Sequence, residues 1–185
     1  MLYKQFKELE LSSLGFGTMR LPLIPGGKDK DIDQEELDRM VDCAIAGGVN
    51  YFDTAYPYHG GCSELAIGKS LARYPRESFY LADKFPGHQI VKGVKKLDPE
   101  TIFEEQLKKC GVEYFDFYLL HNINEHSMSY YGNPENKYLD YFLQQKANGR
   151  IKHLGFSCHS AAEGLEQFLQ MCGDKMEFCQ IQLNY

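Results

Sequence analysis

The stretch YFDTAYPYHGGCSE, residues 51–64, joins the end of an expected strand to a glycine-containing loop. Asp53 closes the apolar run VNYFDTA, and Tyr58 follows a few residues later, just ahead of two glycines. Parallel α/β enzymes assemble their sites at the carboxyl ends of strands. The spacing of Asp53 and Tyr58 therefore indicates either a chemical device or a simple turn, and the rest of the chain is needed to decide between them.

Apolar runs rich in β-branched and aromatic residues recur along the chain with helical segments between them. Their starts lie about 27 to 36 residues apart, which is the length of one strand-plus-helix unit. This spacing predicts a parallel sheet. The six expected strands are LGFGTMRLP (14–22), VNYFDTA (49–55), FYLADKF (79–85), FDFYLLH (115–121), IKHLGFS (151–157) and FCQIQLN (178–184).

The connecting segments have the pattern of amphipathic helices. DQEELDRMVDCAIAGG, residues 33–48, places apolar residues at helical spacing, acidic residues in the first turn and two glycines at the end. DPETIFEEQLKKCGV, residues 98–112, offers Asp98 as an N-cap and Pro99 at the first helical position. One irregular insertion, residues 122–137, follows the fourth expected strand, and long loops of this kind are often functional.

Composition limits the classes of protein to consider. The 185 residues are 43% hydrophobic and 25% charged, which predicts a single folded domain over residues 1–185. The net charge of -6 argues against a nucleic-acid partner. A secretory signal and a membrane-spanning apolar run are both absent from the sequence, and its six cysteines show no CxxC spacing, so we expect a cytoplasmic protein with reduced thiols and no metal site.

Two architectures fit such an α/β sheet: a doubly wound sheet or a (β/α)8 TIM barrel. The dinucleotide fingerprint of a doubly wound sheet is G-x-G-x-x-G after the first strand. The segment GFGTMR, residues 15–20, contains only G-x-G. The signal for a doubly wound sheet is therefore weak. If the sheet is a barrel, the carboxyl ends of the strands are the positions to inspect.

Polar side chains stand at the ends of three consecutive expected strands: Asp53, Lys84 and His121. A tyrosine phenol has a pKa of about 10 and needs nearby positive charge to act as an acid at neutral pH. Lys84 can supply that charge to Tyr58, Asp53 can hold Lys84 cationic, and His121 can polarise the same oxygen. Each residue alone also has a structural explanation as a cap, turn or packing residue. Together they favour a general acid for a carbonyl oxygen.

Six segments resemble the aldo/keto reductase family in both order and spacing, and together they cover nearly the whole chain. They are GFGTMRLP, YFDTAYPYHGGCSE, LADKFP, FYLLHNIN, GRIKHLGFSCHS and CQIQLNY. The resemblance implies that Asp53, Tyr58, Lys84 and His121 form the family's catalytic tetrad. It further implies a (β/α)8 barrel that binds NADPH in an extended pose and transfers a hydride to an aldehyde or ketone, with Tyr58 supplying the proton.

Cofactor contacts are implied by the same resemblance. The family's Ser-Asn pair for the nicotinamide carboxamide corresponds to Ser157 and Cys158, and a thiol cannot replace an amide's paired donor and acceptor. His159, next in the chain, is a candidate to compensate. The cofactor-binding residues implied in this way are Gly17, Thr18, Asp53, Ser157, Cys158 and Gln180.

The chain also departs from the family in length. A complete barrel of eight units typically needs about 250 residues, whereas about six β/α units are present here, so we expect a barrel truncated after its sixth strand. The sequence resembles a bacterial branch of the family with a C-terminal ferredoxin-like segment, and an iron-sulfur cluster is expected only in a longer parent protein. The alternative function is a non-catalytic scaffold that binds nucleotide or a partner, or an inactive fragment of a reductase. The sequence leaves open the identity of the small carbonyl substrate, the choice between NADPH and NADH, and self-association.

Overall fold

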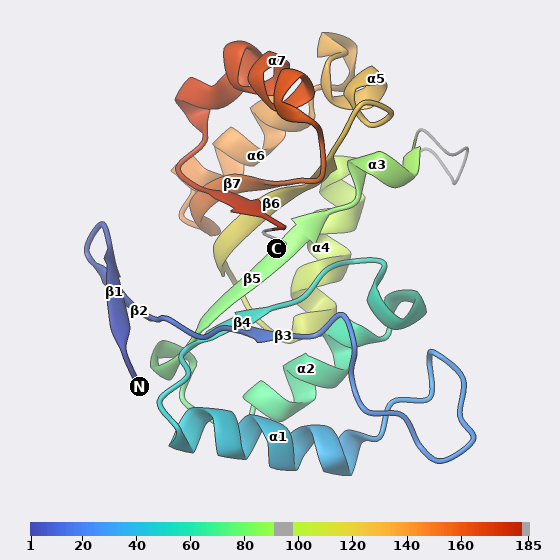
Figure 1. The fold of residues 1–185 in the computed structure, drawn as a ribbon, viewed down its shortest axis with the longest axis vertical. Coiled ribbons are helices and arrows are strands. Elements are labelled where there is room, and N and C mark those ends of the chain that lie inside the picture. The colour runs from blue at the N-terminus through green and yellow to red at the C-terminus, as the bar shows by residue number, and fades with distance from the viewer. Residues whose placement is uncertain (91–97, 183–185) are drawn as a thin grey trace. The chain divides into compact units, whose positions relative to one another are not determined.

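Six parallel strands, hydrogen-bonded in chain order, form the main sheet in the computed structural model, which describes residues 1–90 and 98–182. A doubly wound sheet would reverse its strand order part-way, and the order β3-β4-β5-β6-β7-β8 contains no reversal. The prediction of a barrel-type α/β order with about six strands is therefore confirmed (Figure 1). The strands are β3 (Phe16–Gly17), β4 (Tyr51–Asp53), β5 (Tyr80–Phe85), β6 (Phe115–Ile123), β7 (Ile151–Cys158) and β8 (Cys179–Ile181).

Each of the six expected runs overlaps one of these strands. β3, β4 and β8 are shorter than expected, whereas β6 and β7 continue past the expected ends. β3 ends at Gly17 because the chain then turns into a loop, in which Leu23 and Ile32 form an isolated antiparallel bridge. β8 covers three residues of the expected run 178–184, and positions 183–185 lie outside the described residues. The ends of a sheet are where sequence patterns define strand length least well.

A two-stranded hairpin, β1 (Tyr3–Phe6) with β2 (Leu9–Ser12), precedes the main sheet and was not among the expected elements. Phe6 pairs with Leu9, so Lys7 and Glu8 form the turn, and Lys7 adopts a positive φ of 50°. Tight two-residue hairpin turns usually carry Asn-Gly or Asp-Gly at this position. Lysine carries no such signal, which explains why the sequence pattern did not reveal the hairpin.

The chain forms two compact units, and their boundary falls within β5. The first unit comprises residues 1–83 and 106–112; the second comprises residues 84–105 and 113–185. The expectation of a single barrel domain over residues 1–185 stays a prediction.

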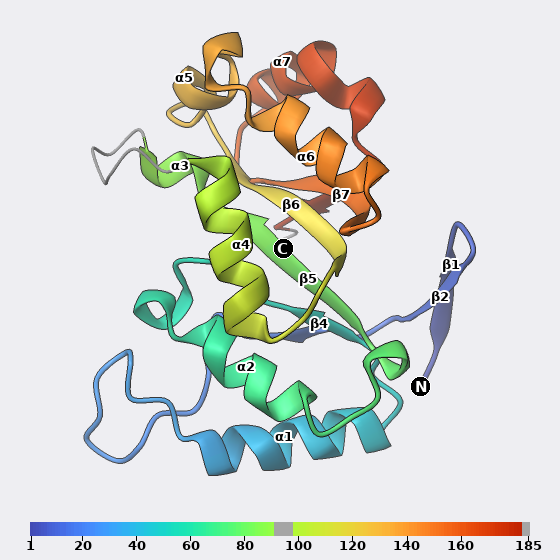
Figure 2. The same ribbon diagram turned by 180° about the vertical axis from the view of Figure 1, so that it is seen from behind.

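In the first unit, α1 (Gln34–Ala46) and α2 (Ser63–Leu71) lie side by side (Figures 1 and 2). Asp33 caps α1 as an extended residue whose side chain accepts from the Glu36 amide, and Glu35 and Glu36 stand in the first turn, where acidic residues were expected. Gln34 joins the two helices, because its amide donates to the Ala66 carbonyl at 3.1 Å and to Ser70 Oγ at 3.0 Å. Two short 3-10 helices complete this unit: η1 (Tyr58–Gly61) and η2 (Arg76–Ser78).

In the second unit, helices pack on β6 and β7 through an aromatic core. Phe103, Tyr118 and Phe142 are fully buried, and their ring centroids lie 4.9 to 6.2 Å apart. Helix α6 lies against β7 (Figure 2). The helices of this unit are α3 (Gly87–Ile90), α5 (Met128–Tyr131), η3 (Pro134–Asn136), α6 (Tyr138–Ala147), α7 (Ala162–Cys172) and η4 (Gly173–Lys175). Helix α4 (Pro99–Cys110) belongs to this unit up to residue 105 and to the first unit from residue 106.

The expected cap of α4 is confirmed, because the Asp98 carboxylate accepts from the Thr101 amide at 2.9 Å and the helix begins at Pro99. The insertion at 122–137 contains the short helices α5 and η3. Across the residues that the structure describes, helices are too short or too polar to cross a membrane.

Candidate active site

Asp53 lies at the carboxyl end of β4, where the strand pattern predicts it. It pairs in register with Gly17 of β3 and Ala82 of β5 and is 8% exposed. The backbone around Asp53 is also hydrogen-bonded to the chain on both sides. The Thr18 amide donates to the Asp53 carbonyl at 2.9 Å, and the Thr54 amide donates to the Ala82 carbonyl at 3.0 Å. The position of the Asp53 side chain is thus set by hydrogen-bonded backbone on both sides.

Tyr58 opens the 3-10 turn η1 and is half-buried, with its amide donating to the Ala55 carbonyl at 3.1 Å. The residue after it, His59, adopts a left-handed φ of 51° and is buried. His59 Nε2 accepts from the Leu21 amide at 2.9 Å, so the ring proton is on Nδ1, which lies 2.7 Å from the Asp29 carbonyl oxygen. His59 therefore fastens the turn carrying Tyr58 to the loop after β3. Sequence reasoning missed this residue, because its partners lie 30 and 38 positions away in the chain.

Three fully buried hydroxyls hold the backbone next to Asp53. Ser63 Oγ donates to Thr18 Oγ1 at 2.7 Å and lies 3.0 Å from Thr54 Oγ1. The Thr18 side chain is thus engaged in the interior of the first unit. Gly17 is exposed, and a Cβ added to it would meet nothing within 4 Å, so its surface is open to a ligand.

A buried ion pair in the first unit was also missed by sequence reasoning. Glu64 is fully buried, and its Oε2 lies 3.0 Å from Lys109 Nζ. Burial raises the pKa of Glu64 above its usual value, although the Lys109 ammonium lowers it. The Lys109 ammonium also lies over the Tyr56 ring, 4.3 Å from its centroid.

Lys84 and His121 belong to the second unit and are both buried, with 2% and 7% of their surfaces exposed. Burial lowers the pKa of His121 well below its usual value, and the charges of Lys84, His88 and His159 lower it further. The imidazole is therefore neutral at pH 7. The His88 ring meets the His121 ring edge to face, with centroids 4.7 Å apart. Sequence reasoning did not single out His88.

The expected carboxamide-binding residues lie on neighbouring strands. Ser157 of β7 pairs in register with Gln180 of β8, and the Asn122 amide donates to Ser157 Oγ at 2.8 Å. Ser157 can still donate its own hydroxyl proton, and Gln180 carries both a donor and an acceptor. Cys158 is buried, and its Sγ accepts from the Ser160 amide at 3.4 Å. Ser157 and Gln180 therefore suit a carboxamide, whereas the thiol of Cys158 faces a local backbone donor.

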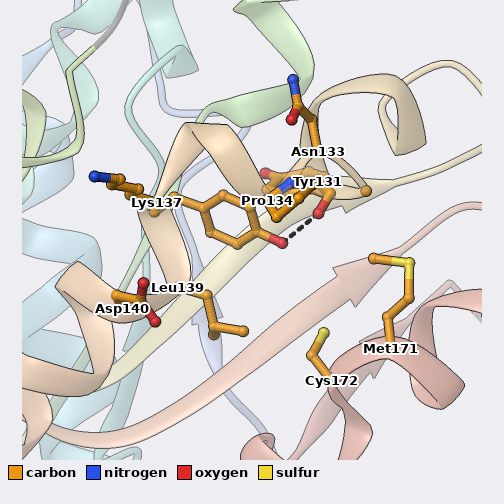
Figure 3. A pocket seen from close by; sticks show the side chains of 10 residues that line it. Tyr131, Asn133, Pro134, Lys137, Leu139, Asp140, Met171 and Cys172 are labelled. Atoms are coloured by element: carbon orange, nitrogen blue, oxygen red, sulfur yellow. Dashed lines mark hydrogen bonds between the residues drawn. The ribbon is translucent and has the colours of Figure 1, made fainter.

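A hollow of about 370 Å³ lies beside the 122–137 insertion (Figure 3). Tyr131 and Tyr138 line it together with Met171 and Cys172 of α7, and the Tyr138 hydroxyl donates to the Tyr131 carbonyl at 2.6 Å. Tyr130 packs against Tyr131 and Tyr138, with ring centroids 5.5 and 5.6 Å apart, and against Phe85 at 6.1 Å.

Within residues 1–90 and 98–182, no three His, Cys, Asp or Glu side chains lie close enough together to hold a metal ion.

The strand order is that of a barrel-type α/β protein. Asp53, Lys84 and His121 are buried polar residues near the carboxyl ends of their strands, and Tyr58 opens the turn η1 after β4. The family model "Aldo/keto reductase family" matches residues 13–185. The chain belongs to this family.

Individual relatives agree with this assignment. A probable aldo-keto reductase 1 from Glycine max is 29% identical over 153 residues, which is 80% of this chain and 42% of the relative. An NADH-specific methylglyoxal reductase from Escherichia coli K12 is 27% identical over 180 residues, covering 88% of this chain and 53% of the relative. The chain thus spans about half the length of these curated relatives.

Solved structures confirm the fold. A thermostable aldo-keto reductase bound to the inhibitor epalrestat superposes with a TM-score of 0.75 at 27% identity, covering 100% of this chain and 63% of that chain. A Klebsiella pneumoniae aldo/keto reductase in complex with NADP and acetate gives a TM-score of 0.72 at 21% identity, with 97% of this chain and 56% of that chain covered. The α/β fold of TIM-barrel type, present over part of its length, is therefore established.

Proposed function

We propose that this chain carries the reductase site of its family, in which a hydride passes from NADPH to an aldehyde or ketone and Tyr58 supplies the proton. The observation that carries the proposal is the pair Lys84 and His121, both buried, with the imidazole held neutral. Burying a charged lysine costs free energy, and interaction with an anion offsets that cost. Buried ionisable groups of this kind cluster at functional sites. In the proposed site, the Lys84 ammonium would favour the phenolate that is left when Tyr58 gives up its proton.

The roles of the four residues follow from their chemistry. Tyr58 is the acid, Lys84 lowers the cost of the phenolate, and Asp53 keeps Lys84 protonated. His121, neutral at pH 7, can donate an N–H to the substrate oxygen as negative charge develops there. The bound nicotinamide would supply the hydride, and Ser157 and Gln180 are the residues proposed to orient its carboxamide. Gly17, Thr18 and Asp53 are proposed to line the same cofactor site. Cys158 is the weakest of the proposed contacts, because its Sγ already accepts a backbone hydrogen bond.

Small carbonyl compounds are the proposed substrate class. The E. coli relative is a methylglyoxal reductase described as NADH-specific, and the Klebsiella structure contains NADP. Methylglyoxal with either reduced nicotinamide is therefore the first combination to test. A cytoplasmic location and a chain that binds neither nucleic acid nor metal stay predictions.

The test compares Tyr58→Phe with Tyr56→Phe in the 185-residue chain, following NADPH oxidation with a panel of small aldehydes and ketones. Loss of a general acid lowers turnover by about 100-fold or more, so we expect that loss for Tyr58→Phe. Tyr56→Phe keeps the ring beneath Lys109 and should stay within about twofold of the unsubstituted chain. Equal turnover in all three proteins would refute the acid role. Cofactor binding without any carbonyl turnover would support the alternative of a nucleotide-binding scaffold.

A further inference from the structure

The Tyr131 hydroxyl lies where the two strands carrying Lys84 and His121 end. Tyr131 is the last residue of α5, in the insertion after β6, and is 2% exposed. Its hydroxyl donates to the His121 carbonyl at 2.9 Å and also lies 3.2 Å from the Phe85 carbonyl. Phe85 follows Lys84 directly in β5. One phenolic proton is thus shared between the backbone of both strands.

The chain around Tyr131 holds this hydroxyl in place. The Tyr138 hydroxyl donates to the Tyr131 carbonyl at 2.6 Å (Figure 3), and the two rings meet edge to face with centroids 5.2 Å apart. The Tyr131 amide donates to the Ser127 carbonyl at 3.0 Å. Ser127 Oγ in turn donates to the Asn122 carbonyl at 2.9 Å, next to His121. The insertion is therefore tied back to β6 through its own backbone and side chains.

Gly87, the second residue after β5, leaves room for the phenol ring of Tyr131. A Cβ on Gly87 would lie 2.5 Å from Tyr131 Cζ and 2.6 Å from its hydroxyl oxygen. Any larger residue would push the ring away. Burial raises the pKa of Tyr131 well above its usual value, so the hydroxyl keeps its proton and remains a donor across the physiological pH range.

We propose that Tyr131 is a positioning residue, whose hydroxyl clamps the ends of β5 and β6 and thereby sets the positions of Lys84 and His121. The proposal rests on the proposed function in so far as these two residues act in carbonyl reduction. Tyr131 itself is not assigned a contact with substrate.

Removing the hydroxyl leaves two buried carbonyls without this donor, and buried polar groups that lose a partner draw in water or shift. Water near His121 would relieve the burial that lowers its pKa. The charged groups facing His121, namely Lys84, His88 and His159, stay in place. In Tyr131→Phe we therefore expect the pKa of His121 to rise toward the ordinary histidine value.

The experiment is an NMR titration of the isotope-labelled 185-residue chain, with His121 assigned from the resonance lost in His121→Gln. Tyr131→Phe should move the carbonyl carbon resonances of Phe85 and His121 and raise the titration midpoint of His121. The matched control is Tyr130→Phe, which removes a hydroxyl from the same helix and keeps the ring contact with Phe85. The control should reproduce the unsubstituted spectrum at these positions.

A second variant and a kinetic measurement distinguish a positioning role of the Tyr131 hydroxyl from a general loss of folding. Gly87→Ala keeps the Tyr131 hydroxyl but displaces the ring, and it should give the same NMR changes. In the reductase assay, Tyr131→Phe should lower kcat by about tenfold, equivalent to one lost hydrogen bond, with KM changed less than about twofold. Carbonyl resonances and a His121 titration identical to those of Tyr130→Phe would overturn the clamp. An absence of turnover in the unsubstituted chain would instead count against the proposed function, while the NMR shifts would still establish the clamp.

Discussion

Replacing Lys109 by methionine should destabilise the first unit strongly, and more at high pH than at low pH. Methionine keeps the length and apolar stem of lysine but removes the ammonium that lies 3.0 Å from Glu64 Oε2. Glu64 is fully buried, whereas the Lys109 side chain is 16% exposed. The substitution therefore leaves a buried carboxylate without its opposite charge.

The size of the effect follows from the burial of the pair. Breaking a buried ion pair by removing one partner costs about 3–5 kcal/mol, and the partial exposure of Lys109 favours the lower end of that range. The lost contact between the ammonium and the Tyr56 ring adds about 0.5–1 kcal/mol. We therefore expect the free energy of unfolding to fall by about 3–4 kcal/mol at pH 8.

The pH dependence has a definite sign. Burial raises the pKa of Glu64 in the folded chain above its ordinary value of 4.5. A carboxyl of this kind contributes stability that is present below pH 4.5 and is lost as pH rises through the folded-state pKa. Because Lys109 lowers that pKa, its removal raises the pKa further. The damage should therefore be smaller at pH 5, where Glu64 can take up a proton in the folded state.

Urea unfolding at pH 5 and pH 8 measures both quantities. Lys108→Met is the matched control, because Lys108 is the exposed neighbour in the same helix, and it should change stability by less than about 0.5 kcal/mol. The double variant Glu64→Gln with Lys109→Met removes both charges and should be more stable at pH 8 than Lys109→Met alone. Equal losses at the two pH values, or no recovery in the double variant, would refute the reasoning.

Three further outcomes are expected. Asp98→Ala removes the cap of α4 and should lower the free energy of unfolding in urea by about 1 kcal/mol; no change would show that water replaces the cap. Gly155→Ala places a Cβ 2.5 Å from the Phe178 ring and 2.6 Å from its carbonyl oxygen, which should cost about 1–3 kcal/mol by overpacking in the same assay. Burial raises the pKa of the Cys172 thiol to about 11, so iodoacetamide at pH 8 followed by mass spectrometry should label exposed Cys43 and spare Cys172; equal labelling would contradict the packing of α7.

Local sequence patterns predicted the regular part of this fold well. The six strand runs, the Asp98 cap of α4 and the parallel sheet depend on periodicity and capping within a few residues. The register that sets Ser157 opposite Gln180 was not predicted and comes from the structure. Features that are local, or that repeat with a fixed period, can be predicted from a single sequence.

Other features depend on contacts between distant residues. The Tyr131 hydroxyl meets a carbonyl 46 positions earlier, and Glu64 meets Lys109 45 positions later. Nothing in the residues around Tyr131 distinguishes it from Tyr130, which packs on Phe85 instead. Only the three-dimensional arrangement shows that the Tyr131 hydroxyl contacts the Phe85 and His121 carbonyls.

Hydride transfer is the most direct test of the proposed function. The chain would be incubated at high concentration with NADPH carrying deuterium at the transferred position and with methylglyoxal or another small aldehyde, and the alcohol would be analysed by mass spectrometry. We predict deuterium on the new carbinol carbon, with at least about a 100-fold smaller yield in Tyr58→Phe. Saturable binding of NADPH, seen from its fluorescence, without any deuterated alcohol would contradict the assignment of this chain as a carbonyl reductase.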